Sequence, residues 1–329
     1  MSLKNRKLTY SLAINEAIHQ MMASDKSVFI IGQGVKSPWY VGNTCEGLLE
    51  RFGPERVIDT PVSENVITGA SVGASLVGMR PVVVHPRMDF MMYAMDPIIN
   101  EAANWHYMFG GKSSVPVVIW GIINRGGEQA AQHSQALQAL FVHIPGLKVV
   151  MPSTPYDAKG LMISGIRDDN PVIFIDDRWL YKVEGEVPKK MYTVPIGKAV
   201  IRKRGKDVTL ATTSYMVWEA AKTVNDLVKK GIDVELIDLR SLKPLDTSLL
   251  FASVKKTGRL VVVDGGWKTC GFAAEITALV SENAFHFLKA PILRVTLPDT
   301  PAPASSVLEE AYYPKARDIC KAIMEAYNR

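Results

Sequence analysis

Glu64 and His133 are the two residues whose types and positions are best suited to chemistry. Glu64 begins a predicted helix directly after a short predicted strand, a point where open α/β sheets place ligand-binding groups. A carboxyl group can donate or accept a proton, and an imidazole does so near neutral pH. Each residue has a structural alternative. Glu64 can complement the positive end of its helix, and His133, in the run AAQHSQ before another predicted helix, can be a cap.

No familiar nucleotide or metal motif accompanies these residues. The loop 33–43 (QGVKSPWYVGN) is polar and rich in glycine, but it lacks the Gly-x-Gly-x-x-Gly spacing of a dinucleotide turn, and no phosphate-binding Gly-x-x-x-x-Gly-Lys-Ser/Thr loop occurs. Cys45, Cys270 and Cys320 are far apart in the sequence, without the spacing of a zinc or redox motif. Phe90 follows the strand 81–84, and its ordinary role would be a core aromatic.

The stretch 56–84 is expected to position Glu64. It predicts a strand, an acidic turn at residues 59–61, a helix with Ser63 as its N-cap, and a second strand opened by Pro81. Small residues recur along the predicted helix at positions 69, 70, 73 and 74. Because small side chains let another backbone approach closely, we expect tight packing against this helix.

The remaining pattern predicts an α/β protein with two domains. Apolar runs and helical periods alternate on both sides of a polar, aperiodic stretch between residues 181 and 200, which is typical of a linker. We predict a first domain over residues 1–185, a linker and domain entry over 186–205, and a smaller α/β domain over 206–329. Right-handed crossovers would make the second sheet mainly parallel. We also expect one amphipathic helix over 91–105 and a strand over 115–120.

Composition excludes several classes of function. The 329 residues are 47% hydrophobic, with a net charge of only +5, and the basic clusters lack interleaved aromatics, so a nucleic-acid surface is not expected. The N-terminal residues lack the apolar segment of a secretory signal, and no apolar run reaches the about 18 residues that a membrane span needs. We therefore predict a cytoplasmic protein that is not bound to a membrane.

Six segments, in order and over nearly the whole chain, resemble the β chain of two-component thiamine-diphosphate-dependent 2-oxo acid dehydrogenases, of the pyruvate, branched-chain and acetoin types. The segments are VIDTPVSENVITGASVGASLVGMRPVV, AMDPIINEAANW, AAQHSQALQALFVHIPGLKVVMPSTPYDAKGLMISGIRDDNPVIF, DLRSLKPLDTSLL, VVVDGGWKTCGFAAEI and ILRVTLPDTPAPAS.

The resemblance implies a pyrimidine-binding domain followed by a transketolase-type C-terminal domain, and it implies roles for five residues. Glu64 would hydrogen-bond the aminopyrimidine ring of thiamine diphosphate, and Phe90 would stack on that ring. His133 would act at the substrate end, assisting acyl transfer to a lipoyl carrier. Asp168 and Asn170 match a turn that holds a structural potassium ion in some relatives.

The chain departs from the family pattern at two places near the expected substrate pocket. Gln33 stands where relatives commonly carry glutamate, and His85 and Arg87 belong to a segment that is usually more apolar or carries glutamine. We therefore hypothesise a substrate other than pyruvate, bulkier or more polar, with Arg87 as an anion contact.

The chain lacks the Gly-Asp-Gly segment through which this superfamily holds magnesium against the diphosphate. The resemblance therefore implies a partner α chain that holds magnesium, a heterotetramer of two α and two β chains with a shared cofactor, a lipoyl acyltransferase core, and a 2-oxo acid or acetoin as substrate. Two alternatives remain: the C-terminal half of a split transketolase, and a non-catalytic scaffold subunit.

Overall fold

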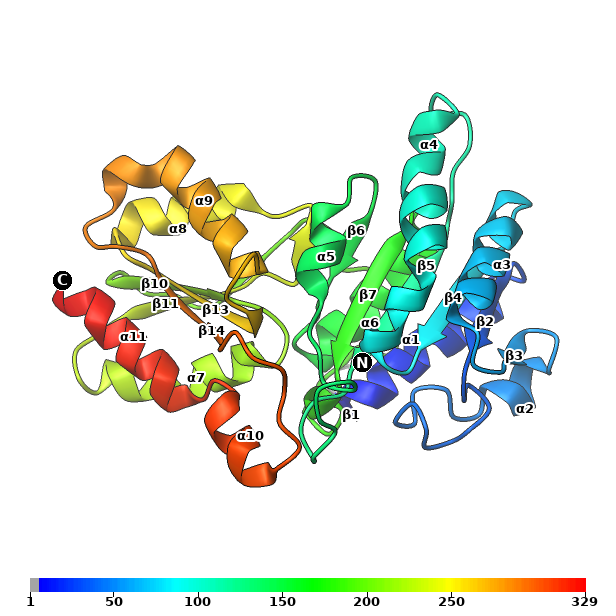
Figure 1. The fold of residues 1–329 in the computed structure, drawn as a ribbon, viewed down its shortest axis with the longest axis horizontal. Coiled ribbons are helices and arrows are strands. Elements are labelled where there is room, and N and C mark those ends of the chain that lie inside the picture. Colours follow the sequence, from blue (N-terminus) through cyan, green and yellow to red (C-terminus); the bar gives the residue numbers. More distant parts are fainter. Residues whose placement is uncertain (1–5) are drawn as a thin grey trace, which may run out of the picture. The chain divides into compact units, whose positions relative to one another are not determined.

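The computed structural model describes residues 6–329, which divide into two compact units (Figure 1). The described residues of unit 1 are 6–125 and 140–196, and unit 2 comprises Gly126–Ala139 and Gly197–Arg329. Each unit has its own sheet, and helices pack against it. The loop that carries His133 therefore groups with the second unit.

Unit 1 contains a sheet whose strands lie in the order β6-β7-β5-β4-β2-β3, with parallel neighbours. Its elements are β1 (Lys7–Thr9), α1 (Tyr10–Ser24), β2 (Val28–Gly32), α2 (Leu48–Phe52), β3 (Val57–Asp59), α3 (Glu64–Leu76), β4 (Arg80–His85), the 3₁₀ turn η1 (Met88–Ala94), the π-helical turn η2 (Pro97–Ala103), α4 (Asn104–Met108), β5 (Val118–Ile123), α5 (Gln138–His143), β6 (Lys148–Val150), α6 (Pro155–Arg167), β7 (Val172–Asp177), η3 (Arg178–Leu180) and β8 (Glu184–Glu186).

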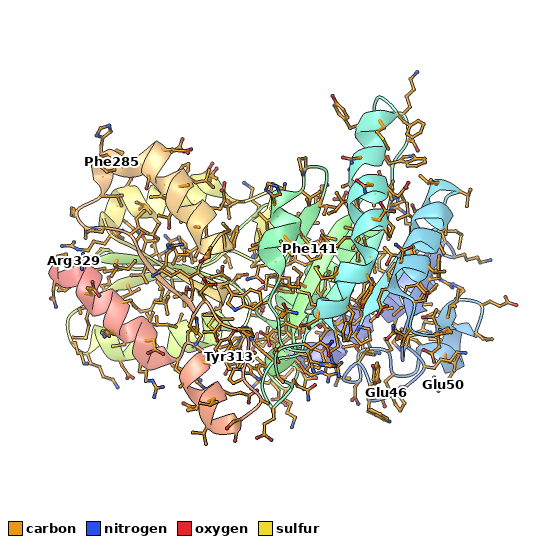
Figure 2. All side chains as sticks on the ribbon, viewed as in Figure 1. Glu46, Glu50, Phe141, Phe285, Tyr313 and Arg329 are labelled. Atoms are coloured by element: carbon orange, nitrogen blue, oxygen red, sulfur yellow. The ribbon has the colours of Figure 1, made fainter. Side chains whose placement is uncertain are left out.

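The core of unit 1 follows from its uninterrupted apolar strands. Every residue of β2, β5 and β7 is buried, as expected for parallel strands covered on both faces. Helix α1 packs against α6, and α3 packs against β4, η1 and η2. Phe141 on α5 is fully buried and lies among the interior side chains in Figure 2, whereas Glu50 on α2 is exposed.

Unit 2 has a sheet with the order β14-β13-β10-β11-β9, in which only the pairing of β9 with β11 is antiparallel. The expectation of a mainly parallel second sheet is therefore confirmed. Figure 1 shows α8 and α9 on one face of this sheet and α7 and α11 on the other. The elements are β9 (Val200–Lys203), β10 (Val208–Thr212), α7 (Met216–Val228), β11 (Val234–Asp238), β12 (Ser241–Lys243), α8 (Thr247–Thr257), β13 (Leu260–Trp267), α9 (Phe272–Ala284), η4 (Phe285–Phe287), β14 (Leu293–Leu297), α10 (Ser306–Tyr312) and α11 (Ala316–Asn328).

Three local predictions were wrong. The segment 91–105 is not one helix: it passes from η1 through η2, which Pro97 opens, into α4. The strand predicted over 115–120 starts only at Val118, after a proline that cannot donate to a ladder. The stretch after Tyr181 is not wholly irregular, because β8 pairs antiparallel with β1.

Helix α3 differs from its prediction in two respects. Ser63 precedes the helix but makes no side-chain capping bond, since its backbone (φ −165°, ψ 64°) is not in the extended conformation that an N-cap residue normally adopts. The small residues do not meet another backbone within the described chain. A Cβ at Gly69 would meet only Pro97 at 3.9 Å, and one at Gly73 would have nothing within 4 Å. This face of α3 is open.

Candidate active site

The carboxyl ends of β2, β4, β5 and β7, with the residues that directly follow them, form one edge of the unit 1 sheet, which we call the carboxyl edge. The parallel register pairs Gly32 with Val84 and Ile123 with Asp177, so β2 ends level with Val84 of β4, and β5 ends level with β7. Ligand-binding groups of open α/β sheets lie at this edge. The sequence of unit 1 places Gln33, Glu64, His85, Arg87 and Arg178 there or close to it.

Glu64, the first residue of α3, is 7% exposed and is held by Gln33. The side-chain amide of Gln33 donates to Oε1 of Glu64 over 3.1 Å. Gly32, directly before Gln33, leaves no room for a side chain, because a Cβ at this position would lie 2.4 Å from the carbonyl oxygen of Val84. Oε2 of Glu64 has no hydrogen-bond partner within residues 6–329 and is not among the fully buried atoms. The carboxyl group is thus fixed at one oxygen and available at the other.

His85 ends β4 and faces α3, with only 1% of its surface exposed. Its Nε2 lies 3.1 Å from Oγ1 of Thr68, one turn along α3 from Glu64. Burial lowers the pKa of His85 to about 4, because the charged form would be desolvated. The imidazole is therefore neutral near pH 7, and it adds no positive charge to the carboxyl edge.

Arg87 and Arg178 follow β4 and β7 and meet at Tyr40, in the loop after β2. The guanidinium carbon of Arg87 lies 5.7 Å from the centre of the Tyr40 ring, and Nη2 of Arg178 donates to the Tyr40 carbonyl oxygen over 2.6 Å. Both arginines are half-buried. Two positive charges therefore stand at the carboxyl edge beside one tyrosine.

Two adjacent aspartates end β7, and both are fully buried. The Asp177 carboxylate forms a buried ion pair with Arg125. Asp176 lies beside the side chains of Tyr181 and Trp120, and burial raises its pKa to about 7. Asp177, the residue directly before Arg178, is thus paired with Arg125 and not with Arg178. Asp176 is only partly ionised near neutral pH.

Phe90 and His133, which the sequence assigned to the cofactor and the substrate, lie in different units. Phe90 is in η1, half-buried, and its backbone amide donates to the carbonyl oxygen of Arg87. His133 lies in the segment Gly126–Ala139 of unit 2. Two acids fix that segment within its own unit: Asp264 accepts from Gln138 over 2.6 Å, and Glu309 accepts from the backbone N–H of Glu128 over 3.1 Å.

Asp168 and Asn170 form a turn at the opposite edge of the unit 1 sheet, the amino edge, where β4, β6 and β7 begin. One Asp168 carboxylate oxygen pairs with Lys148 at 2.5 Å, and the other accepts the backbone N–H of Asn170. The guanidinium of Arg80 donates to the carbonyl oxygen of Asp168 at 3.1 Å. The side-chain oxygens of Asp168 are thus already engaged with protein donors, and a potassium ion here would depend on backbone carbonyl oxygens.

Across residues 6–329, no group of three or more histidine, cysteine, aspartate or glutamate side chains is arranged to hold a metal ion. No helix in that range is long and apolar enough to cross a lipid bilayer.

Comparison with known proteins gives the class and then the family. A family model described as the transketolase pyrimidine binding domain matches residues 6–183, and one described as the transketolase C-terminal domain matches residues 197–319. These matches define a transketolase-type protein with two domains. A solved structure titled split gene transketolase, inactive beta4 tetramer, has the same fold: the TM-score is 0.78, the identity is 22%, and the match covers 98% of both chains.

Close relatives in sequence narrow the class. The chain is 48% identical over 327 residues to the acetoin:2,6-dichlorophenolindophenol oxidoreductase subunit beta of Cupriavidus necator, with 96% of each chain covered. It is 43% identical over 317 residues to the pyruvate dehydrogenase E1 component subunit beta of Rickettsia felis, covering 96% of this chain and 97% of the relative. The chain therefore belongs to the family of acetoin and pyruvate dehydrogenase β subunits, as its sequence motifs predict.

Sequence reasoning missed three features of the carboxyl edge: the Gln33–Glu64 hydrogen bond, the meeting of Arg87 with Arg178, and the buried Asp176. The sequence predicts Gln33 near the substrate pocket and gives no role to Arg178. The available signal was the position of Gln33, Arg87 and Arg178 just after strands, which in a parallel sheet brings such residues to a common edge.

Proposed function

We propose that this chain supplies the pyrimidine-binding half of a thiamine-diphosphate site and that, with an α chain, it cleaves a 2-oxo acid or acetoin and transfers the acyl group to a lipoyl carrier. The observation that carries the proposal is the buried Glu64 carboxyl group, fixed at Oε1 by Gln33 and without a partner in the described chain at Oε2. Relatives at 42–48% identity are acetoin dehydrogenase β subunits, which favours this reaction over two-carbon transfer by a split transketolase.

The side chains proposed for this site are of types that suit a flat heterocyclic ring and its substrate. Thiamine diphosphate, when bound, supplies a nucleophilic carbon for attack on a carbonyl. Glu64 would share a hydrogen with a ring nitrogen through Oε2, because Gln33 already holds the other oxygen. Phe90 would pack on the face of the ring, and His133 would give or take a proton at the substrate end. The low exposure of Glu64 would exclude water from the shared hydrogen.

An α chain is needed because this chain lacks the Gly-Asp-Gly segment, and its described residues contain no acidic or histidine cluster for a metal. We assign magnesium mainly to the α chain and propose two α and two β chains. The open face of α3 supports a subunit contact: Val66 is 64% exposed and Val77 is 81% exposed. Docking on a lipoyl acyltransferase core, and potassium at Asp168 and Asn170, remain proposals that rest on the resemblance.

The test compares the chain alone with the chain co-expressed with an α-type partner that carries Gly-Asp-Gly. Calorimetric titration with thiamine diphosphate and magnesium is expected to give weak binding and no turnover for the single chain, and tight binding with thiamine-dependent decarboxylation for the complex. Strong turnover by the purified single chain would refute the proposal. A complex that assembles but stays inactive on every 2-oxo acid and on acetoin would favour the scaffold alternative.

A further inference from the structure

Arg87 and Arg178 both contact Tyr40 and are far apart in the sequence of unit 1. Arg87 follows the end of β4 and faces the ring of Tyr40, whereas Arg178 follows the end of β7 and donates to its carbonyl oxygen. Arg178 also lies against the Tyr181 ring, with 5.9 Å between its guanidinium carbon and the ring centre. The register of the parallel strands therefore brings together two arginines that are 91 residues apart in the sequence.

Each guanidinium uses only part of its donors. Nη1 of Arg87 donates to the carbonyl oxygen of Pro86 over 2.8 Å, and Nη2 of Arg178 donates to Tyr40. The other terminal nitrogens, Nη2 of Arg87 and Nη1 of Arg178, bond to nothing in the described part of the chain and are not among its fully buried polar atoms. Neither arginine forms an ion pair with any described acid, so both retain donors that solvent or a ligand can reach.

The acids around the two arginines compensate their charge only in part. Asp177 is paired with Arg125, and Asp176 is buried with its pKa raised to about 7. Asp89, also buried, is the remaining acid close to Arg87. Burial lowers the pKa of Arg87 from its usual value, and the nearby charge of Arg178 lowers it further. Two cations that act on each other's charge and are only partly compensated by acids favour an incoming anion.

We propose that Arg87 and Arg178 bind an oxyanion, a carboxylate or a phosphate, that the substrate carries away from its reacting carbonyl. Guanidinium groups match the oxygens of both anions through paired hydrogen bonds. The proposal rests on the proposed function, since it places the substrate at the carboxyl edge, and it names a substrate class: a 2-oxo acid that carries a second oxyanion, either a carboxylate or a phosphate.

The bound anion is a second group and not the carboxylate that leaves as carbon dioxide. Two guanidinium groups on the leaving carboxylate would stabilise the substrate more than the transition state, because its charge moves away during decarboxylation. Contacts to a remote anion hold substrate and transition state equally, and they also orient the carbonyl. Pyruvate and acetoin have no such second anion.

Direct binding tests the site without turnover. The complete α–β complex is titrated with inorganic phosphate and, separately, with succinate, and heat or tryptophan fluorescence is followed. Removing one guanidinium in Arg178→Met or Arg87→Met is expected to weaken binding of the preferred anion by about tenfold or more, with partial recovery in Arg178→Lys. Arg204→Met, a change at an exposed arginine of unit 2, is the matched control and is expected to bind as wild type.

Kinetics then separates the two sources of anion. Pyruvate, 2-oxoglutarate and phosphohydroxypyruvate, a phosphorylated 2-oxo acid, are compared in wild type and in both methionine variants. We expect kcat/KM for the anion-bearing substrate to fall about tenfold or more in the variants, and to fall by a larger factor than kcat/KM for pyruvate. A preference for 2-oxoglutarate assigns a carboxylate, and one for phosphohydroxypyruvate assigns a phosphate.

Several results would overturn the inference. Absence of saturable phosphate and succinate binding in wild type, or equal affinities in wild type and both methionine variants, would show that the arginines only fix the loop around Tyr40. A fall in thermal stability with unchanged anion affinity would show the same. If the anions bind as expected but no substrate is turned over with thiamine diphosphate, the proposed function fails and the anion site stands.

Discussion

The two edges of the unit 1 sheet differ in how fully several of their charged side chains are paired. At the amino edge, Lys148 pairs with Asp168, while Arg80 reaches two backbone carbonyl oxygens and Asp169. At the carboxyl edge, Arg87 and Arg178 have no ion-pair partner in the described chain, and Glu64 is held at a single oxygen.

This difference indicates that the charged side chains at the amino edge serve stability, whereas those at the carboxyl edge serve binding or chemistry. Paired side chains at the amino edge satisfy backbone groups where strands begin, and each contributes modestly to stability. Incompletely paired groups at the carboxyl edge are costly to keep, since partly buried charges lose hydration. A protein that keeps such groups at the edge where α/β sheets bind ligands retains them for binding or chemistry. Substitutions at the two edges should therefore affect different measurements.

Glu64→Gln is expected to have the largest effect. The amide keeps the shape and the bond partner of the carboxyl group but cannot move a proton, so we expect the rate of the α–β complex to fall by about 10³-fold. Thermal melting and gel filtration should remain as in wild type. Gln33→Ala, which removes only the hydrogen bond to Oε1, is the matched variant, with a loss of about tenfold. A Glu64→Gln complex as active as wild type would contradict the assignment of chemistry to the carboxyl edge.

Asp176→Asn tests the cost of a buried acid at the carboxyl edge. The pKa of Asp176 is raised to about 7, so the folded state holds its proton between about pH 4 and pH 7 while the unfolded state has lost it. The stabilisation is fully present below about pH 4 and is lost as the pH rises through 7. Asparagine has no such dependence.

We therefore expect Asp176→Asn to raise the free energy of unfolding relative to wild type by about 2–4 kcal/mol at pH 9, with little difference at pH 4. Urea denaturation at both pH values measures it. A gain that is the same at pH 4 and pH 9 would mean that ionisation of Asp176 is not its cause.

Arg80→Met is the counterpart at the amino edge. It leaves the carbonyl oxygens of Ile166 and Asp168 without their donor, so the free energy of unfolding should fall by about 1–3 kcal/mol. Substrate kinetics of the assembled complex should stay within about twofold of wild type. Asp169→Asn, at a side chain that is 67% exposed, is the control, with a change below about 0.5 kcal/mol. A large loss of kcat in Arg80→Met, with an unchanged free energy of unfolding, would contradict the purely structural role that our account gives to the amino edge.

Local pattern was enough to predict most of the fold but not the contacts of the site. The order strand, helix, strand over residues 56–84 was predicted and is observed as β3, α3 and β4, because apolar runs between polar turns leave little choice. The bond between Gln33 and Glu64 joins residues 31 apart, and the arginine pair joins residues from the ends of two strands. Such contacts depend on strand order and register, which no local pattern specifies.

The family was predicted from sequence resemblance and not from local pattern, and the relatives confirm it. The roles of Glu64, Phe90 and His133, which the same resemblance implies, stay predictions. The departures from the family were also visible in the sequence, at Gln33 and Arg87. Their consequence was not, because the partners Glu64 and Arg178 become neighbours only through the parallel sheet.

The most direct test is an experimental structure of the assembled α–β complex with thiamine diphosphate bound. The distance to measure joins Oε2 of Glu64 to the nearest nitrogen of the pyrimidine ring. Our account predicts a hydrogen bond of about 2.6–3.0 Å there, with the diphosphate held by the α chain. A Glu64 carboxyl group directed away from the ring, or a cofactor enclosed by one polypeptide, would contradict it.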